Sequence, residues 1–232
     1  MSAVSELKEI QYKDGEVLAM TKDDFAEESA LYKFLLAFDD NQISVIKCGL
    51  VQGVDISVYA KSDMNYNVMN LVRECLCKGL DITPYANSQF SIEQIDEIIK
   101  GLVAGLDVSI YAKPEFTYAQ MWQIRLGLES GIDVSIYAKP ELSYNQMYHI
   151  KLGLEKGVDI SSHIDSRFND EQLSIIRYGA EAGVDVSVYA KREFNAQQME
   201  QIMLGLQEGI DVSIYAKSEI PAVEMRVMRC KL

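Results

Sequence analysis

The chain has 232 residues, of which 35 are acidic and 22 basic, so its formal net charge is −13. This acid excess argues against nucleic acid and anionic membranes as partners, because binding to phosphates depends on Lys and Arg. No apolar run approaches the roughly 18 residues of a membrane-spanning helix, and the first residues lack the order of a signal peptide. The four cysteines fit neither a disulfide framework nor a zinc site. We therefore expect a cytoplasmic protein with reduced cysteines.

Residues 1–37 precede the repetitive part of the chain and are expected to form an N-terminal cap. The pair Asp14-Gly15 is typical of a tight hairpin turn, and it is compatible with a small hairpin there. A longer amphipathic pattern begins at Thr21 and predicts a helix up to about residue 38. A cap of this kind would cover the first exposed face of an open array.

An aspartate in the motif Gly-[Val/Leu/Ile]-Asp recurs every 26 residues without insertion or deletion. A fixed period of this size predicts a solenoid or a propeller. Seven units fill residues 38–219, and a short segment, 220–232, restarts the unit and is expected to form a C-terminal capping helix. The recurring aspartates are Asp55, Asp81, Asp107, Asp133, Asp159, Asp185 and Asp211.

Each unit begins with the sequence signals of an α-helix. In the fourth unit, Thr117 is a suitable N-cap and Gln120, three residues later, completes a capping box. Apolar residues then follow at helical spacing until Gly131, where a left-handed residue would end the helix. The same signals recur in the other units and predict helices near residues 40–52, 66–78, 92–104, 118–130, 144–156, 170–182 and 196–208.

The remaining residues of a unit, "DVSIYAKPEF" in its clearest form, are too few for a long helix. Asp133 can cap a turn together with Ser135, and Pro140 prevents continuation. The β-branched residues would also suit a strand, but the Asp-x-Ser start favours one or two turns of α- or 3-10 helix. An α-helix and a short helix in every repeat predict an all-α solenoid, in which stacked repeats supply one another's core.

Two groups of corresponding positions, here called columns, have an expected packing role. A glycine lies inside the helix of six units, as at Gly127, although glycine there is about 1 kcal/mol less favourable than alanine. We expect it to allow close approach of the backbones of adjacent repeats. A tyrosine recurs in the short helix, as at Tyr137, and we expect it to pack against the next unit.

Catalytic and metal-binding patterns are absent from the sequence. His149 occupies a column of varied residues, which suggests partial exposure. His163 replaces the recurring tyrosine in a polar unit, and with Asp165 it is a secondary candidate for partner contact. Ser162, His163 and Asp165 are too close in sequence to align as a catalytic triad. The recurring aspartates lack the clustered oxygen ligands of calcium sites, so we expect no enzyme, metal or cofactor.

The main candidate site is a group of aromatic residues in two middle repeats. The column of Trp122 and Tyr148 holds Ser, Asn, Asp or Glu in the other units, so it is expected to face outward. Packing against a neighbouring helix is the alternative. Aromatic and basic residues on one surface are typical of binding hot spots. The candidate partner-binding residues are Tyr118, Trp122, Arg125, Tyr144, Tyr148 and Lys151.

The phrase "QMxxIRLGLExG[IV]DVSxYAKPEF", closest between residues 101 and 157, resembles a short helical repeat of proteins from anaerobic gut bacteria, their phages and mobile elements. Its layout is also similar to leucine-rich variant repeats, although its motif departs from that family. The resemblance implies a cellular setting and no particular activity.

We expect a protein-binding scaffold, a monomer or weak homo-oligomer, with inhibition of or adaptor action on a host protein as a special case. A small-molecule or nucleotide binder that uses the solenoid groove, and a self-assembling structural array, are the alternatives.

Overall fold

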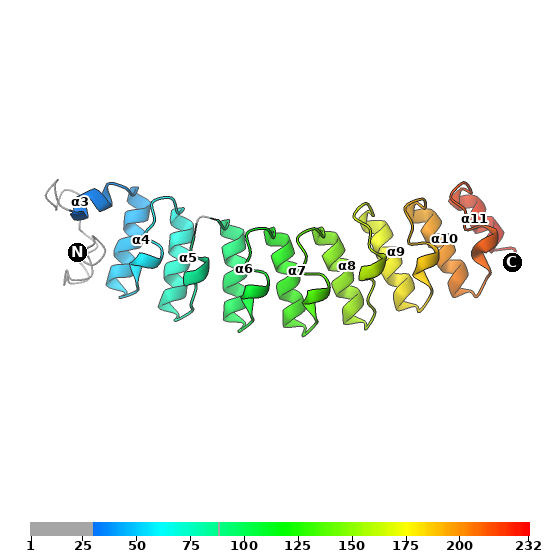
Figure 1. Cartoon of the computed structure of the whole chain (residues 1–232), viewed down its shortest axis with the longest axis horizontal. Coiled ribbons are helices and arrows are strands. Elements are labelled where there is room, and N and C mark those ends of the chain that lie inside the picture. The colour runs from blue at the N-terminus through cyan, green and yellow to red at the C-terminus, as the bar shows by residue number, and fades with distance from the viewer. Residues whose placement is uncertain (1–29, 88) are drawn as a thin grey trace. The chain divides into compact units, whose positions relative to one another are not determined.

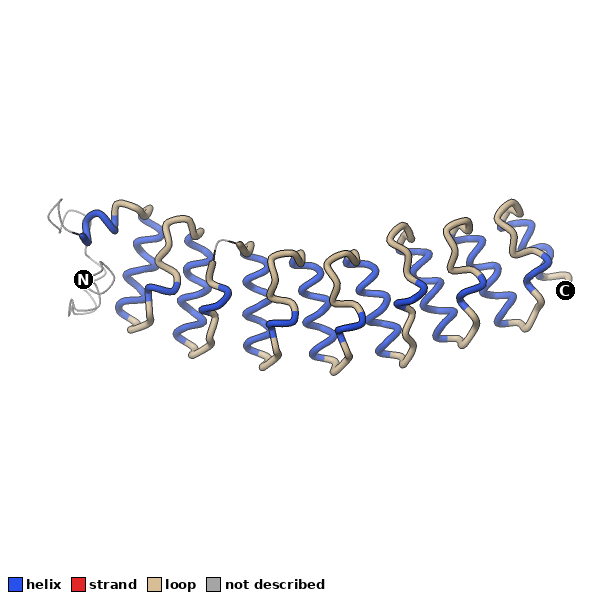
Figure 2. The backbone as a smooth tube through the Cα atoms, viewed as in Figure 1, coloured by secondary structure: helices blue, strands red, loops and turns tan. Residues whose placement is uncertain are grey.

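The computed structural model describes residues 30–87 and 89–232, and this part of the chain is all-helical. It contains nine α-helices and seven 3-10 helices, with no strand in the described ranges. The predicted all-α solenoid is confirmed, because each repeat consists of an α-helix followed by a short helix, and neighbouring α-helices pack against one another (Figures 1 and 2). The predicted hairpin and the start of the predicted N-terminal helix lie outside the described residues.

The chain divides into two compact units at Pro114, close to the junction between the third and fourth repeats. In the first unit, α4 packs against α5, and α5 packs against α6 (Figure 1). Its described elements are α3 (Ala30–Leu35), α4 (Asp40–Val51), η2 (Ile56–Val58), α5 (Tyr66–Cys77), η3 (Thr83–Tyr85), α6 (Ile92–Val103) and η4 (Val108–Ile110).

The second unit, from Glu115 to the C-terminus, contains five α-helices, each packed against its neighbours in the sequence. The last of them is the predicted C-terminal helix. The elements are α7 (Tyr118–Glu129), η5 (Val134–Ile136), α8 (Tyr144–Glu155), η6 (Ser161–His163), α9 (Asp170–Glu181), η7 (Val186–Val188), α10 (Ala196–Gln207), η8 (Val212–Ile214) and α11 (Ala222–Arg229).

Local capping signals fix the ends of the long helices. In α7, the Thr117 hydroxyl accepts from the backbone N–H of Gln120 at 3.3 Å, and the Gln120 amide oxygen accepts from the N–H of Thr117 at 2.8 Å. The same box forms in α4, α6, α8, α9 and α10. All seven repeat helices begin at the predicted residue and end one residue earlier than predicted, because the last predicted residue is the C-cap.

The helix ends also follow the predicted chemistry. Gly131 has φ 71°, in the left-handed region, and its N–H donates to the carbonyl of Leu128. The next N–H, of Ile132, reaches back to the carbonyl of Gly127, which completes a Schellman motif. Positive φ recurs at the corresponding glycine of all seven repeats.

The short element is a three-residue 3-10 helix, which decides between the alternatives that the sequence left open. In η5, the Asp133 carboxylate accepts from the backbone N–H of Ser135 at 3.0 Å. This hydrogen bond and that of the Ser135 side chain lower the pKa of Asp133, which confirms that the recurring aspartate acts as a cap.

The glutamine of the capping box has a further task that sequence analysis missed. The Nε2 atom of Gln120 donates to the carbonyls of Pro140 and Leu142, at 3.0 and 2.6 Å, in the loop that begins the next repeat. Equivalent bonds are made by Gln42, Gln94, Gln146, Gln172 and Gln198. The sequence signal is the choice of Gln over Glu, since both can complete a capping box but only Gln can also donate.

The recurring tyrosine is buried against the helix of its own repeat. The Tyr137 side chain has no exposed surface, and its hydroxyl donates to the Gln123 carbonyl at 3.2 Å. Burial raises its pKa far above the ordinary value. The hydroxyl occupies the space that a side chain at Gly127 would need, because a Cβ there would lie 1.8 Å from it. The glycine was predicted to let the backbones of adjacent repeats approach, and the tyrosine to pack against the next unit. Both predictions were wrong, because the two residues contact each other within one repeat.

The two irregular repeats support this explanation of the glycine column. In the second repeat, Cys75 replaces the glycine, and Tyr85 is only half-buried. In the fifth repeat, His163 replaces the tyrosine and is also half-buried. In the five regular repeats the 3-10 helix packs closely on its own α-helix, and this packing is weaker in the two irregular ones. The glycine and the tyrosine therefore act as a pair.

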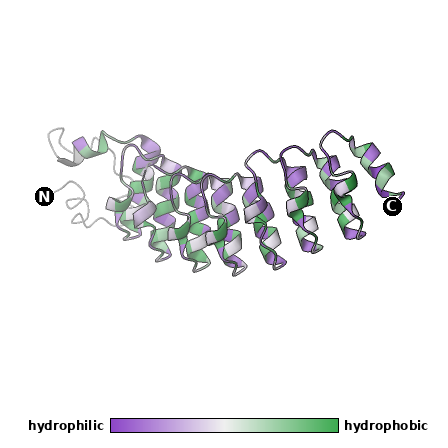
Figure 3. Ribbon diagram, turned by 45° about the vertical axis from the view of Figure 1, so that its right-hand side comes forward, coloured by the Kyte–Doolittle hydropathy of each residue, from purple (hydrophilic) through white to green (hydrophobic). Residues whose placement is uncertain are grey.

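The core lies along the inner face of the helices, while the outer face is polar or mixed, so each helix carries both kinds of residue (Figure 3). The column in the middle of the buried face is apolar in every repeat. It includes Ile124, Ile150 and Ile176, whose side chains have no exposed surface. Among the described helices, none has the length and apolarity needed to cross a membrane.

The glycine–tyrosine pair is tested in the sixth repeat, where a Cβ on Gly179 would lie 1.8 Å from the Tyr189 hydroxyl and no nearer than 3.1 Å to any other atom. Gly179→Ala should lower the free energy of unfolding by about 1–3 kcal/mol, despite its better helix propensity. The penalty should shrink in a Tyr189→Phe background, because the hydroxyl is gone. Urea unfolding of the two single variants and the double variant measures this coupling. Stabilisation by Gly179→Ala alone would contradict the pair.

The second task of the box glutamine is tested by Gln120→Glu. The carboxylate still accepts from Thr117 but cannot donate to Pro140 and Leu142, so the free energy of unfolding should fall by about 1–3 kcal/mol. The reverse change, Glu224→Gln in α11, is the control, because Glu224 is exposed and surface changes usually stay within about 0.5 kcal/mol. Equal effects of the two substitutions in urea unfolding would show that the donor bonds do not matter.

Candidate functional site: an aromatic surface on α7 and α8

Three aromatic rings form a continuous row on α7 and α8, in the second unit. Trp122 and Tyr144 are nearly parallel, with ring centroids 6.1 Å apart and 9° between their planes. Tyr144 and Tyr148 are 6.4 Å apart at 15°. Tyr118 lies one turn before Trp122 on α7. We call these four residues the aromatic surface.

The aromatic surface is open to solvent. Tyr118, Trp122 and Tyr148 are 54, 38 and 37% exposed, and Tyr144 is half-buried between its two neighbours. The outward orientation predicted from the Trp122 column is confirmed, since no member of that column is buried. The alternative of packing also holds in part, because Tyr144 joins the two helices by contact with Trp122.

Arg125 and Lys151 lie in a different place from the rim predicted for them. They are only 9 and 7% exposed. Arg125 pairs with Glu129 at 2.5 Å and Lys151 with Glu155 at 2.8 Å, each one turn along its own helix. Their long apolar stems favour burial while the charged ends remain paired, so neither cation extends from the surface toward a partner.

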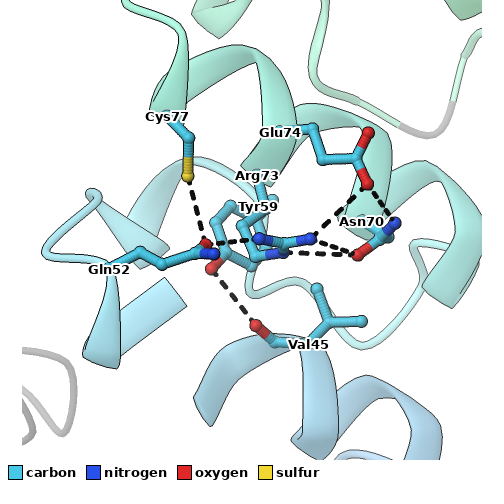
Figure 4. Close-up of polar contacts among 7 residues, drawn as sticks. All are labelled: Val45, Gln52, Tyr59, Asn70, Arg73, Glu74 and Cys77. Atoms are coloured by element: carbon cyan, nitrogen blue, oxygen red, sulfur yellow. Dashed lines mark hydrogen bonds and ion pairs between the residues drawn. The ribbon is translucent and has the colours of Figure 1, made fainter. Parts of the chain in front are cut away.

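The first unit shows the same basic column acting between repeats. Arg73 of α5 reaches back to the Gln52 side chain at the end of α4, and it also binds Asn70 at 2.8 Å (Figure 4). The Cys77 thiol donates to the same Gln52 oxygen at 3.1 Å. In α11, Arg229 likewise contacts Gln201 and Glu208 of α10. At these two positions the column contributes to the stacking of repeats.

His149 is buried, and the prediction that it is partly exposed was wrong. Its side chain lies in the seam between α8 and α9, where Nε2 is 3.1 Å from the Asp170 carboxylate. Its Nδ1 atom has no hydrogen-bond partner among the described residues. Burial lowers the pKa of His149, and nearby Arg177 acts in the same direction, while Asp170 opposes them. The column varies because its residues face different neighbours across each seam.

The secondary candidates, His163 and Asp165, belong to a polar loop of the irregular repeat. Asp165 forms ion pairs with Arg167 and with Arg192 of the next repeat. His163 is half-buried, and no hydrogen bond joins it to Ser162 or Asp165 in the described structure. The ion pair with Arg192 shows that Asp165 links two repeats.

Tyr178 of α9 is an exposed aromatic residue that sequence analysis missed. It is 53% exposed, and the guanidinium of Arg177 lies 4.1 Å above its ring. Its column holds Leu in three other repeats, so neither a repeated pattern nor proximity in sequence to the other aromatics indicated it. It extends the aromatic character of the outer face to a third helix of the second unit.

A shallow pocket in the first unit is the other concave feature considered as a binding site. Three of its polar residues accept backbone hydrogen bonds from their own segments: Asn65 from Asn67, Ser91 from Gln94 and Asn87 from Gln89. Asp63 is the charged residue of its lining. In the described part of the chain, no group of three or more His, Cys, Asp or Glu side chains is arranged to hold a metal ion.

Comparisons with protein-family models, with curated proteins and with solved structures give no match to this chain.

The position of His149 predicts how stability depends on pH. Its pKa is lower in the folded chain than in the unfolded chain, so the unfolded state binds more protons, and stability should fall as the pH drops below about 6.5. His149→Gln should flatten the change in free energy of unfolding between about pH 7.5 and pH 5. Asp170→Asn should steepen it, because Asp170 favours the charged imidazole. Identical pH profiles for all three proteins in urea unfolding would contradict this account.

Proposed function

We propose that the chain is a non-enzymatic scaffold that binds another protein through the aromatic surface on α7 and α8. The observation that carries the proposal is the local concentration of exposed rings. Other repeats fold with Ser, Asn, Asp or Glu in the Trp122 column, so the rings are not needed for the repeat to form. Tyr and Trp are the residues that dominate protein-binding hot spots.

The cellular setting of the partner rests on the resemblance of the repeat phrase to proteins of gut bacteria, phages and mobile elements. In that setting the partner would be a host protein that the scaffold inhibits or links to another protein. The free cysteines among the described residues are consistent with a partner in the cytoplasm. The small-molecule alternative has less support, because the pocket residues in the first unit are engaged in caps.

The proposal is tested with the double variant Trp122→Ala/Tyr148→Ala. Affinity capture from cells of the source organism, followed by mass spectrometry, should yield a partner with the wild type and lose it with the double variant. Truncating one hot-spot residue typically weakens binding by about 2 kcal/mol or more. The double variant loses both stacked contacts of Tyr144, which together should lower the free energy of unfolding by about 1–3 kcal/mol.

Two further variants separate binding from folding. Tyr118→Ala removes the most exposed ring of the surface and should weaken capture at an unchanged melting temperature. Tyr66→Ala is the matched control, because Tyr66 is also exposed and occupies the same column in another repeat. A partner that binds all variants equally would show that the binding surface lies elsewhere. Unfolding of the double variant at room temperature would show that the rings serve packing.

A further inference from the structure

The aromatic surface has the chemistry of a receptor for cationic side chains, and this inference rests on the function proposed above. We propose that its partner presents an arginine-bearing segment whose guanidinium groups stack on Trp122 and Tyr148. The occupant is therefore a basic stretch of a protein.

The rings are arranged to accept planar cations. Trp122, Tyr144 and Tyr148 have nearly parallel planes, and the outer two rings are each more than one-third exposed. A guanidinium stacks on such a ring face by cation–π and planar contacts. Two exposed rings on adjacent helices offer two positions for arginines of one segment.

The protein itself contains one example of this contact. On α9, the Arg177 guanidinium lies 4.1 Å above the Tyr178 ring. In the described structure no cation lies over the rings of Trp122 or Tyr148. The basic residues of their helices are buried and paired along the same helix, Arg125 with Glu129 and Lys151 with Glu155. The outer rings thus remain available to a cation from another molecule.

The charges around the rings favour a basic occupant. Glu129 and Glu155 pair with Arg125 and Lys151 on the helices that carry the rings, and their side chains remain 36 and 30% exposed. Asp170, which contacts His149 next to Tyr148, is 66% exposed. The chain as a whole carries a formal charge of −13, which attracts a basic segment over longer distances.

The same charges disfavour other occupants of aromatic surfaces. Single-stranded nucleic acid stacks its bases on exposed rings, but it also requires a positively charged groove for its backbone. An acidic peptide would meet the exposed carboxylates. Arginine is favoured over lysine because its guanidinium is planar and less strongly hydrated, so it stacks on an aromatic face.

The experiment uses the full chain and short synthetic peptides with several arginines separated by Gly and Ser. Matched peptides carry lysine, or citrulline, which keeps the shape of arginine without its charge. Trp122 is the only tryptophan of the chain, so its fluorescence reports binding at the site. The arginine peptide should change this emission saturably and bind at least about threefold more tightly than the lysine peptide. Its affinity should fall as salt is added.

Variants are measured by the anisotropy of a labelled peptide, which does not depend on the tryptophan. Trp122→Ala should lower the affinity for the arginine peptide by about tenfold or more. Glu155→Gln should lower this affinity less, by about threefold. Tyr66→Ala should leave the affinity unchanged. Citrulline binding as tight as arginine, or equal affinity of the wild type and Trp122→Ala, would overturn the inference.

The failure of this inference can be distinguished from the failure of the proposed function. Suppose the Trp122→Ala/Tyr148→Ala variant loses the partner but the wild type shows no preference for arginine peptides. The aromatic surface would then remain the binding site, and the proposed recognition of arginine would be wrong. No variant-sensitive partner would reject the site itself. Salt-resistant capture of a partner through the same rings would also exclude a basic segment as the main contact.

Discussion

Each regular repeat depends on one contact, in which a tyrosine hydroxyl lies against a glycine of the preceding helix. The contact joins the 3-10 helix to the α-helix and so determines how the chain turns back toward the next repeat. Glycine inside a helix is unfavourable by about 1 kcal/mol, and burial of a whole tyrosine ring offsets it. The pairing explains why the short helix is displaced in the two repeats that contain Cys75 and His163. When one residue of the pair changes, the short helix packs less closely on its own α-helix.

The stacking of repeats uses a second set of contacts, and these vary along the chain. Box glutamines bind the loop of the following repeat through their amide nitrogens. The seams are polar where His149 meets Asp170 and where Gln201 meets Arg229. Between α9 and α10 the corresponding positions hold Ile175 and Met203, both buried. A seam can therefore change its chemistry if both sides change together, which leaves the architecture of the repeat unaffected.

This division of tasks leaves the outer face free for function. The inner columns must satisfy the glycine–tyrosine pair, the caps and the core, whereas the Trp122 column accepts small, acidic and aromatic residues alike. A binding surface can thus be built on two repeats without altering the others, as expected when function resides in a site placed on a fold. The same logic separates the exposed rings from the buried cations of their helices. Arg125 and Lys151 are buried, and the carboxylates that pair with them on the same helices remain partly exposed.

The sequence by itself determined the period, the helix starts, the glycine stops and the outward direction of the Trp122 column, because caps, turns and helical periodicity are local properties. It could not show that Gly127 serves Tyr137, since the two residues are ten positions apart and meet only after the 3-10 helix folds back. It also misplaced Arg125, Lys151 and His149. His149 is buried against Asp170 of the next repeat, 21 residues away, and a polar side chain has no local signal that distinguishes a paired interior position from solvent. Only the tertiary structure decided which polar columns are interior, because only stacking brings their partners into contact.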